Sequence, residues 1–302
     1  MVVLTPASAA LHEIDTTTLA PSRRLACARG SDSMRLAATG RTIWILSRIE
    51  GSLSGVDAKR MERTADHPAP SRPADWALSP DGRRAAFALG PEAAFALLDL
   101  ESGKQARHPT GGAGADLICF RPDGRQLLIG DRTLRRLTIA ETATGRVVTQ
   151  LPLAVAPRHF CFKRDGGELF VTGEGMDAVV TVHPYQTQIA STTLAGRQPG
   201  VMAVSQDFLF VANPGVSTVT VLDIVTRRVV AAVPVGAYPC HISITPGDQY
   251  ALVLNRDSGD MAVIRIETLA GRRRRMAPLF TMVPVGSRPI DAVVRPVEPV
   301  GA

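Results

Sequence analysis

Three side chains suited to acid, base and anion-binding chemistry stand close together in the sequence. Arg158 and His159 are adjacent, and Glu174 follows within the same segment. A histidine can act as a general base near neutral pH, and a glutamate can orient or assist an attacking water. A guanidinium binds a carboxylate or phosphate through two parallel hydrogen bonds. The segment predicts hydrolytic chemistry on a small anionic molecule, provided that the fold brings these groups together.

A turn that recurs along the chain identifies the elements that must position these residues. The turn Ser79-Pro80-Asp81-Gly82 is followed by two similar turns at steps of 42 residues, beginning at Arg121 and Lys163. Weaker copies begin at Ser205 and Thr245. Short apolar runs flank each turn, and such runs, bounded by Pro, Gly and Asp, are typical of strands joined by tight turns.

Four strands per unit, repeated every 40 to 45 residues or so, are the signature of a β-propeller. We expect six complete blades within about 33–289, at 33–73, 75–114, 116–157, 159–199, 201–239 and 241–289. Residues 1–30 supply three strands without an inner one, and residues 290–298 supply one inner-type strand. The sequence therefore predicts a single all-β domain over 1–302, a seven-bladed propeller of four-stranded antiparallel blades. A composite blade from both ends of the chain closes it.

This architecture would gather polar residues from different blades. The loop into each inner strand and the loop out of each second strand open on the same face of a propeller. The opening positions of the inner strands hold Asp75, Asp116, His159, Val201, His241 and Asp291, with Asp32 or Ser33 in the first blade. The positions after the second strands hold Arg48, Arg132, Glu174 and Arg256, with Asn213 and Asn255 one residue earlier in their blades. We expect Asp75, Asp116, His241, Asp291, Arg48, Arg132 and Arg256 to bind ligand around the three catalytic candidates.

Two stretches carry a family resemblance. The segments Phe210-Val211-Ala212-Asn213 and Ser217 to Asp223 resemble the YVTN repeat of β-propellers. The Arg158-His159 pair and Glu174 are similar to the lactonase subgroup of seven-bladed propellers, which includes 6-phosphogluconolactonase. In that subgroup an Arg-His pair and a Glu at these places line the active site. The resemblance implies that Arg158, His159 and Glu174 are catalytic, although Gly173 stands where the family usually has Asn.

Three functions stay open at this point. The first is a lactonase-like hydrolase of a small anionic lactone, with Arg158 and Arg132 holding the anion. The second is a non-catalytic scaffold that binds a ligand or a protein. The third is a divalent metal or redox-cofactor site at the channel mouth, because His and Asp are also metal ligands; no cofactor is otherwise predicted. No Gly-x-Ser-x-Gly motif occurs, so the sequence does not indicate a serine nucleophile.

Composition and charge limit the kinds of partner that we expect. The net charge of +6 comes mostly from scattered arginine pairs, and only Arg272 to Arg275 form a run; with 5% aromatic residues this does not indicate nucleic acid. No apolar stretch reaches the roughly 18 residues of a membrane helix, and no signal peptide is recognisable. We expect a monomer, without a membrane partner, that is cytoplasmic, or periplasmic or secreted if a leader has been removed. The four cysteines show no paired or metal-binding spacing.

Overall fold

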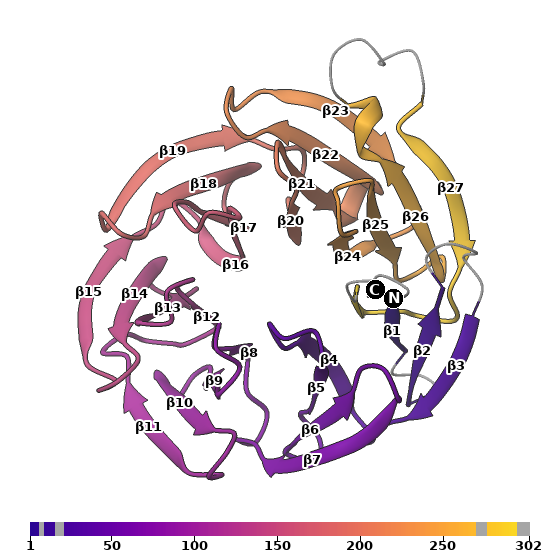
Figure 1. The fold of residues 1–302 in the computed structure, drawn as a ribbon. Coiled ribbons are helices and arrows are strands. Elements are labelled where there is room, and N and C mark those ends of the chain that lie inside the picture. Colours follow the sequence, from indigo (N-terminus) through magenta and orange to yellow (C-terminus); the bar gives the residue numbers. More distant parts are fainter. Residues whose placement is uncertain (6–8, 16–20, 270–276, 295–302) are drawn as a thin grey trace.

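The structure, a computed structural model, describes residues 1–5, 9–15, 21–269 and 277–294. These residues form seven four-stranded antiparallel sheets arranged as a ring (Figure 1). Within this part of the chain no helix is long and apolar enough to cross a membrane. The Arg272–Arg275 run and the predicted strand residues 295–298 lie outside the described residues.

The sheets are numbered here as blades in chain order. Blade 1 consists of β4 (Ser31–Leu36), β5 (Thr42–Ser47), β6 (Ser52–Asp57) and β7 (Glu62–Pro68). Blade 2 consists of β8 (Asp75–Leu78), β9 (Arg84–Ala88), β10 (Ala94–Asp99) and β11 (Gln105–Pro109). Blade 3 consists of β12 (Leu117–Phe120), β13 (Gln126–Asp131), β14 (Arg136–Glu141) and β15 (Val147–Pro152). Blade 4 consists of β16 (Ala156–Phe162), β17 (Leu169–Glu174), β18 (Ala178–His183) and β19 (Gln188–Leu194).

The remaining blades follow the same plan with one exception. Blade 5 consists of β20 (Met202–Val204), β21 (Phe208–Asn213), β22 (Thr218–Asp223) and β23 (Val229–Pro234). Blade 6 consists of β24 (Pro239–Ile244), β25 (Tyr250–Asn255), β26 (Asp260–Arg265) and β27 (Leu279–Pro284). Blade 7 combines β28 (Asp291–Val293) as inner strand with β1 (Val2–Thr5), β2 (Ala10–Ile14) and β3 (Pro21–Ala26). The predicted seven-bladed propeller, closed by a composite blade, is confirmed.

The recurring turns make the hairpins between the inner and second strands. In the first of them Ser79 Oγ donates to Asp81 at 2.6 Å, and the Gly82 N–H donates to the Ser79 carbonyl at 2.9 Å. Gly82, Gly124 and Gly166 have φ angles of +71°, +70° and +72°. Only glycine adopts this left-handed conformation without steric cost, which explains why the Asp-Gly pair recurs.

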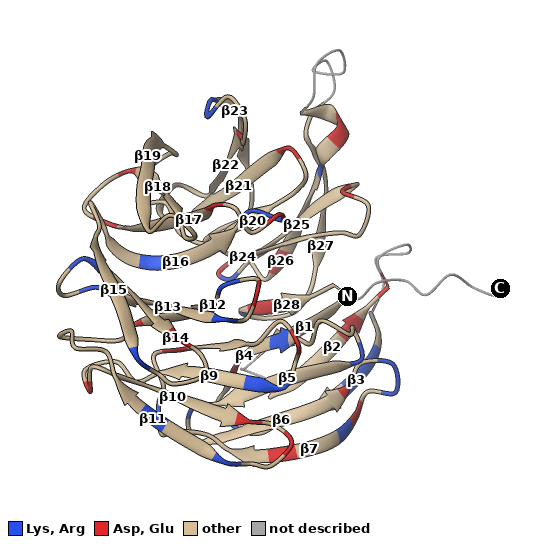
Figure 2. Ribbon diagram, turned by 60° about the vertical axis from the view of Figure 1, so that its left-hand side comes forward, with Lys and Arg blue, Asp and Glu red and all other residues tan. Residues whose placement is uncertain are grey.

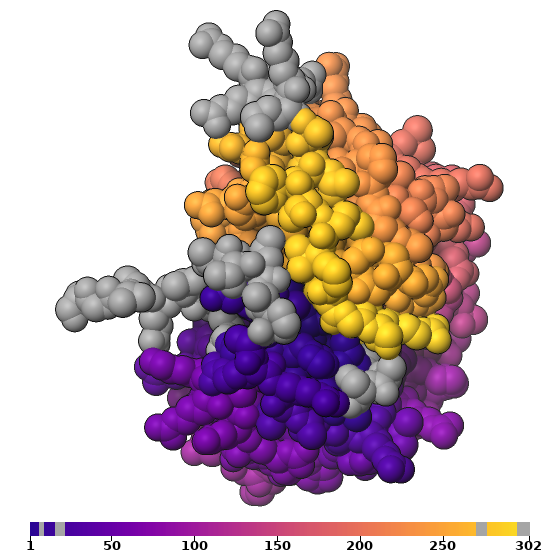
Figure 3. All heavy atoms as spheres, turned by 90° about the vertical axis from the view of Figure 1, so that its right-hand side faces the viewer, coloured from indigo at the N-terminus to yellow at the C-terminus, as the bar shows by residue number. Residues whose placement is uncertain are grey.

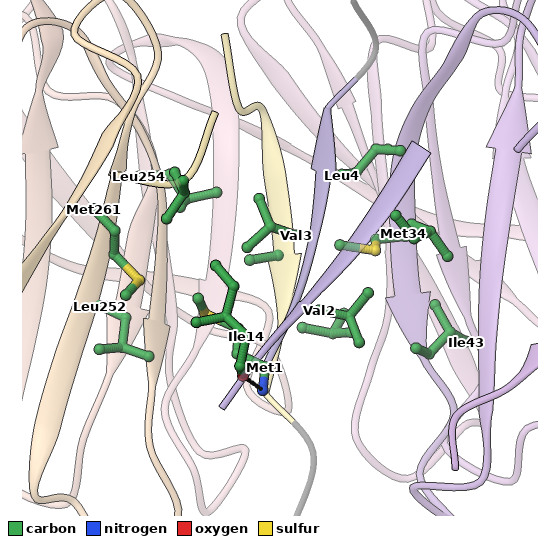
Figure 4. Packing of buried hydrophobic residues seen from close by; sticks show 14 of the residues in the cluster. Met1, Val2, Val3, Leu4, Ile14, Met34, Ile43, Leu252, Leu254 and Met261 are labelled. Atoms are coloured by element: carbon green, nitrogen blue, oxygen red, sulfur yellow. Dashed lines mark hydrogen bonds between the residues drawn. The ribbon is translucent and has the colours of Figure 1, made fainter. Parts of the chain in front are cut away.

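Apolar side chains between neighbouring blades form the core. At the ring closure Val2, Val3 and Leu4 of blade 7 are fully buried, and they pack against blade 6 on one side and blade 1 on the other. Figure 4 shows Leu252, Leu254 and Met261 facing them from blade 6, and Met34 and Ile43 from blade 1. In Figure 3 the indigo N-terminal residues lie directly against the yellow C-terminal ones. Each buried aliphatic side chain stabilises the closure by about 1.5–3 kcal/mol.

Candidate functional site

A β-bulge at the start of blade 4 shapes the segment that carries the catalytic candidates. Pro157 pairs with Gly173 and His159 pairs with Thr172, so Arg158 has no partner across the ladder. A Cβ atom on Gly173 would overlap the backbone oxygen of Ala156. Glycine at position 173 therefore permits the close approach of the two strands at the bulge. Bulges of this kind redirect side chains, and they are frequent beside active sites.

Glu174 binds two arginines from neighbouring blades. Its Oε1 lies 2.6 Å from Nη2 of Arg158 in blade 4 and 2.9 Å from Nη2 of Arg132, which follows β13 of blade 3. The Nε atom of Arg132 is buried and has no hydrogen-bond partner. The three side chains are between 38% and 55% exposed, so each contact is weak and exchangeable. One carboxylate opposite two guanidiniums leaves a net positive charge that suits an anion.

His159 is held in its neutral form. Burial, and after it the positive charges of Arg158 and Arg132, lower the pKa of His159 to about 4. The imidazole therefore keeps a free lone pair at neutral pH and can accept a proton. A base with so low a pKa is less effective than an ordinary histidine, since proton-transfer efficiency follows basicity.

A cavity of roughly 670 Å³ lies beside these groups, between blades 4, 5 and 6. Its volume falls within the range of small-molecule sites. It lies where inner strands begin and second strands end, as the propeller geometry predicts. The polar lining includes Arg158, His159, Glu174, Asp177 and Gln198. The apolar lining includes Met176, Val201, Pro199, Pro214, Tyr238 and Pro239.

The sequence reasoning missed several of these lining residues, among them Gln198 and Tyr238. Both precede a proline, and both have a left-handed backbone, with φ of 52° and 58°. Arg72 and Arg288 stand at the same place in their blades with φ of 48° and 52°. A repeated X-Pro dipeptide before the inner strand was the signal available in the sequence. Such uncommon φ values in non-glycine residues cluster at ligand sites.

Arg256 reaches the pocket only through Tyr238. Its guanidinium carbon lies 3.7 Å from the centre of the Tyr238 ring, and its Nε lies 2.9 Å from Asp257. Arg256 therefore supports the Tyr238 ring, which lines the pocket, but Arg256 does not line the pocket itself.

Three further candidates form a separate network on the inner strands of blades 2, 6 and 7. Asp75 accepts the backbone N–H of Ile118 in blade 3 at 3.0 Å, and Asp291 accepts that of Met34 in blade 1 at 2.8 Å. Each carboxylate thus joins its own blade to the next one. His241 Nδ1 lies 2.9 Å from Asp291 Oδ1. None of the three lines the pocket.

Arg35 connects the two carboxylates of this network. Its guanidinium lies 3.4 Å from Asp291 and 3.7 Å from Asp75. The sequence reasoning did not select Arg35, because it lies in the interior of an inner strand and not at its opening.

The last two candidates make local contacts. Arg48 pairs with Asp32 at 2.8 Å and donates to the carbonyl of Pro73 at 2.7 Å, which ties blade 1 to the loop entering blade 2. Asp116 accepts the backbone N–H of Arg132 at 2.8 Å. The predicted ring is therefore divided. Arg158, His159 and Glu174 meet in one pocket with Arg132 beside them, whereas the other candidates lie outside its lining.

Among the residues that the structure describes, neither the metal-binding groups nor the thiols gather into a further centre. The described residues contain no group of three or more His, Cys, Asp or Glu side chains placed to hold a metal ion. The four cysteines are free. Burial raises the pKa of Cys240, at the pocket wall, to about 12, so its thiol is a poor nucleophile at neutral pH. Figure 2 shows charges of both signs distributed over the molecule.

Comparisons with known proteins agree with the seven-bladed fold. The profile of the family described as "Lactonase, 7-bladed beta-propeller" matches residues 102–280. A seven-bladed beta-propeller protein of Mycobacterium tuberculosis is 23% identical over 136 residues, which are 43% of this chain and 35% of that relative. The chain thus matches about a third of the relative's length.

Solved structures show the same fold at low sequence identity. A functionally unknown protein from Desulfotomaculum acetoxidans has a TM-score of 0.79 at 14% identity, covering 98% of this chain and 99% of that one. Hydrazine synthase of Kuenenia stuttgartiensis has a TM-score of 0.73 at 14% identity, covering 87% and 88%. The dihydro-heme d1 dehydrogenase NirN has a TM-score of 0.70 at 15% identity, covering 96% and 74%. At these identities the likeness concerns the fold alone.

Proposed function

This chain belongs to the lactonase family of seven-bladed β-propellers, and from that premise we propose that it hydrolyses a small anionic lactone in the pocket between blades 4, 5 and 6. The observation that carries the proposal is the sharing of Glu174 by Arg158 and Arg132 at the pocket wall, next to the neutral His159.

Binding would begin with an exchange of anions. A carboxylate or phosphate of the ligand replaces Glu174 as the partner of the two guanidiniums, which present donors in the fork geometry that such anions accept. Because the existing ion pairs are substantially exposed, breaking them costs only about 0.2–1 kcal/mol each. Tyr238 and the neighbouring prolines supply apolar contact for the lactone ring.

Hydrolysis would then use the groups at the bulge. A water oxygen attacks the lactone carbonyl carbon while His159 accepts a proton from that water, and the adjacent guanidinium stabilises the oxyanion that forms. The ring C–O bond breaks, and the proton returns from His159 to the leaving alkoxide. The product is the open hydroxy acid. Glu174, released by the ligand, can orient the water.

The two other functions have less support in the residues described. A metal or redox-cofactor site would need a set of donor atoms, and the described side chains do not bring three such groups together. A scaffold that binds without chemistry would use the same pocket and differ only in turnover.

The proposal is tested by measuring acid release from the 6-phosphate of δ-gluconolactone, which is anionic, and from neutral δ-gluconolactone as a control, both corrected for spontaneous hydrolysis. We expect the wild type to turn over the 6-phosphate in preference to the neutral lactone, and we expect kcat to fall by about 100-fold or more in His159→Gln, the range of a general base. Arg158→Gln should raise KM and also lower kcat, because its guanidinium both holds the anion and stabilises the oxyanion. A wild-type rate equal to that of buffer would overturn hydrolysis. Thermal stabilisation by gluconate without turnover would favour the scaffold.

A further inference from the structure

A second group of hydrogen-bonded residues lies outside the lactone pocket, at the junction of blades 6 and 7. His241 and Ser243 are on β24, and Asp291 is the first residue of β28. His241 Nδ1 lies 2.9 Å from Asp291 Oδ1, and His241 Nε2 lies 2.8 Å from Ser243 Oγ. The carboxylate, the imidazole and the hydroxyl are therefore connected in series through the two ring nitrogens.

This series has the connectivity that activates a serine. An ionised carboxylate can only accept, so Nδ1 carries the proton and Nε2 is free to accept the proton of the hydroxyl. In serine hydrolases the same order of contacts makes the imidazole a general base for the hydroxyl, and the constellation is recognised by geometry and not by sequence position. The distances lie within the range of about 2.6–3.2 Å expected for such a relay.

The carboxylate end of the series is fixed. The side chain of Asp291 is 8% exposed and accepts the backbone N–H of Met34 at 2.8 Å, while Arg35 lies 3.4 Å away. Burial alone would raise the pKa of Asp291, but the charges and hydrogen bonds of His241, Arg35 and Met34 hold it below its ordinary value. Asp291 is therefore an anion that orients the imidazole.

The hydroxyl end is accessible. Ser243 is partly exposed, and the side chain of His241 is 23% exposed. Met34 and Ile118 lie near the start of the inner strands of blades 1 and 3. Their backbone N–H groups donate to Asp291 and Asp75 of the preceding blade. Ile242 has the same register in blade 6, where the preceding blade offers the hydrocarbon side chain of Val201. We expect its N–H to be free to stabilise an oxyanion.

We propose that Ser243, His241 and Asp291 form a second reactive site, independent of the lactone pocket, in which Ser243 is an acyl-accepting nucleophile for small esters. Ser243 Oγ forms a bond to the ester carbonyl carbon, its proton passes to His241 Nε2, and the ester C–O bond breaks. His241 returns the proton to the leaving alcohol. Water, deprotonated by the same imidazole, then releases the acid and restores the serine.

The test uses diisopropyl fluorophosphate, in which attack by Ser243 forms an O–P bond and expels fluoride. Intact-mass and peptide mass spectrometry should show one adduct on Ser243 of the full chain. We expect His241→Asn to reduce the labelling rate by about 100-fold or more, since it removes the general base while the hydroxyl stays in place. His159→Asn, the matched control in the lactone pocket, should be labelled at the wild-type rate.

The two proposals can fail separately. His159→Asn should lose lactone hydrolysis and keep the Ser243 adduct, and His241→Asn should do the reverse. Absence of a wild-type adduct at Ser243, while trypsin is labelled in parallel, would overturn the second site, as would equal labelling of His241→Asn. Circular dichroism and thermal melting check that each variant folds; if His241→Asn does not, the mapped wild-type adduct decides.

Discussion

The exchange of Glu174 for a ligand anion makes a prediction whose sign is unusual for a residue at an active site. In the wild type, an anion must displace Glu174 from Arg158 and Arg132 and then lie close to the released carboxylate. Glu174→Gln removes that competition, so gluconate and inorganic phosphate should bind more tightly to the variant. The same change should not improve hydrolysis, because the glutamine cannot orient water as an anion does.

The size of the effect follows from the exposure of the pairs. The three side chains are 38–55% exposed, so each ion pair contributes about 0.2–1 kcal/mol rather than the larger energy of a buried pair. Two pairs together give about 0.4–2 kcal/mol, which is an affinity gain of about 2- to 30-fold. The gain should shrink as salt is added, because exposed charges are screened.

Isothermal titration calorimetry with gluconate measures this gain directly. Asp177→Asn is the matched control, because Asp177 also lines the pocket, and the structure gives its carboxylate a backbone hydrogen bond from Gln198 but no ion pair with an arginine. The control should change affinity by less than Glu174→Gln does. If Glu174→Gln bound gluconate no more tightly than the wild type, the reasoning would be refuted. If both variants gained affinity equally, the gain would come from the change in net charge and not from the release of the two arginines.

Three further results are expected. The pKa of His159 is about 4 in the folded protein and 6.5 in an unfolded chain, so between these values the unfolded chain binds a proton that the folded chain does not; the stability present above pH 6.5 is therefore lost as the pH falls toward 4, by about 2 kcal/mol between pH 7 and pH 5. Urea melts at the two pH values should show a smaller loss in His159→Gln. Gly173→Ala should cost about 1–3 kcal/mol in urea melts by forcing the bulge apart, whereas Gly167→Ala, where the nearest contact is a surface side chain, should be nearly neutral. Val293→Asp should lower the unfolding free energy by about 3 kcal/mol or more, because it buries an unpaired charge at the ring closure. Val148→Asp, on an outer strand, should change it by less than about 0.5 kcal/mol, and equal effects of the two substitutions would mean that the closure does not limit stability.

Most of the fold could be predicted from the sequence repeat, because the blades are built from similar strands and turns. The Asp-Gly turn sets the inner hairpin of blades 2, 3 and 4, and weaker copies of it mark blades 5 and 6. The strands that remain at the two ends of the chain complete a blade only if they pair with one another. The trio Arg158, His159 and Glu174 was predictable for a related reason: all three belong to one hairpin, β16–β17, so their proximity needs no knowledge of other blades.

The rest of the site depends on contacts between blades, which sequence spacing does not reveal. Asp75 and Asp291 have the residue type and the position of ligand-binding groups, yet they accept backbone N–H groups left free at the edge of the next inner strand. Tyr238 lines the pocket because its left-handed backbone and the stacked Arg256 place it there. The pair of Ser243 and His241 gains its third member, Asp291, from blade 7, which the N-terminal strands complete.

A crystal structure of the protein soaked with gluconate tests the central claim most directly. We expect the carboxylate of gluconate within about 3 Å of the Arg158 guanidinium, the sugar chain between His159 and Tyr238, and Glu174 turned away from both arginines. Gluconate bound elsewhere, or bound with the Arg158–Glu174 contact intact, would contradict the account.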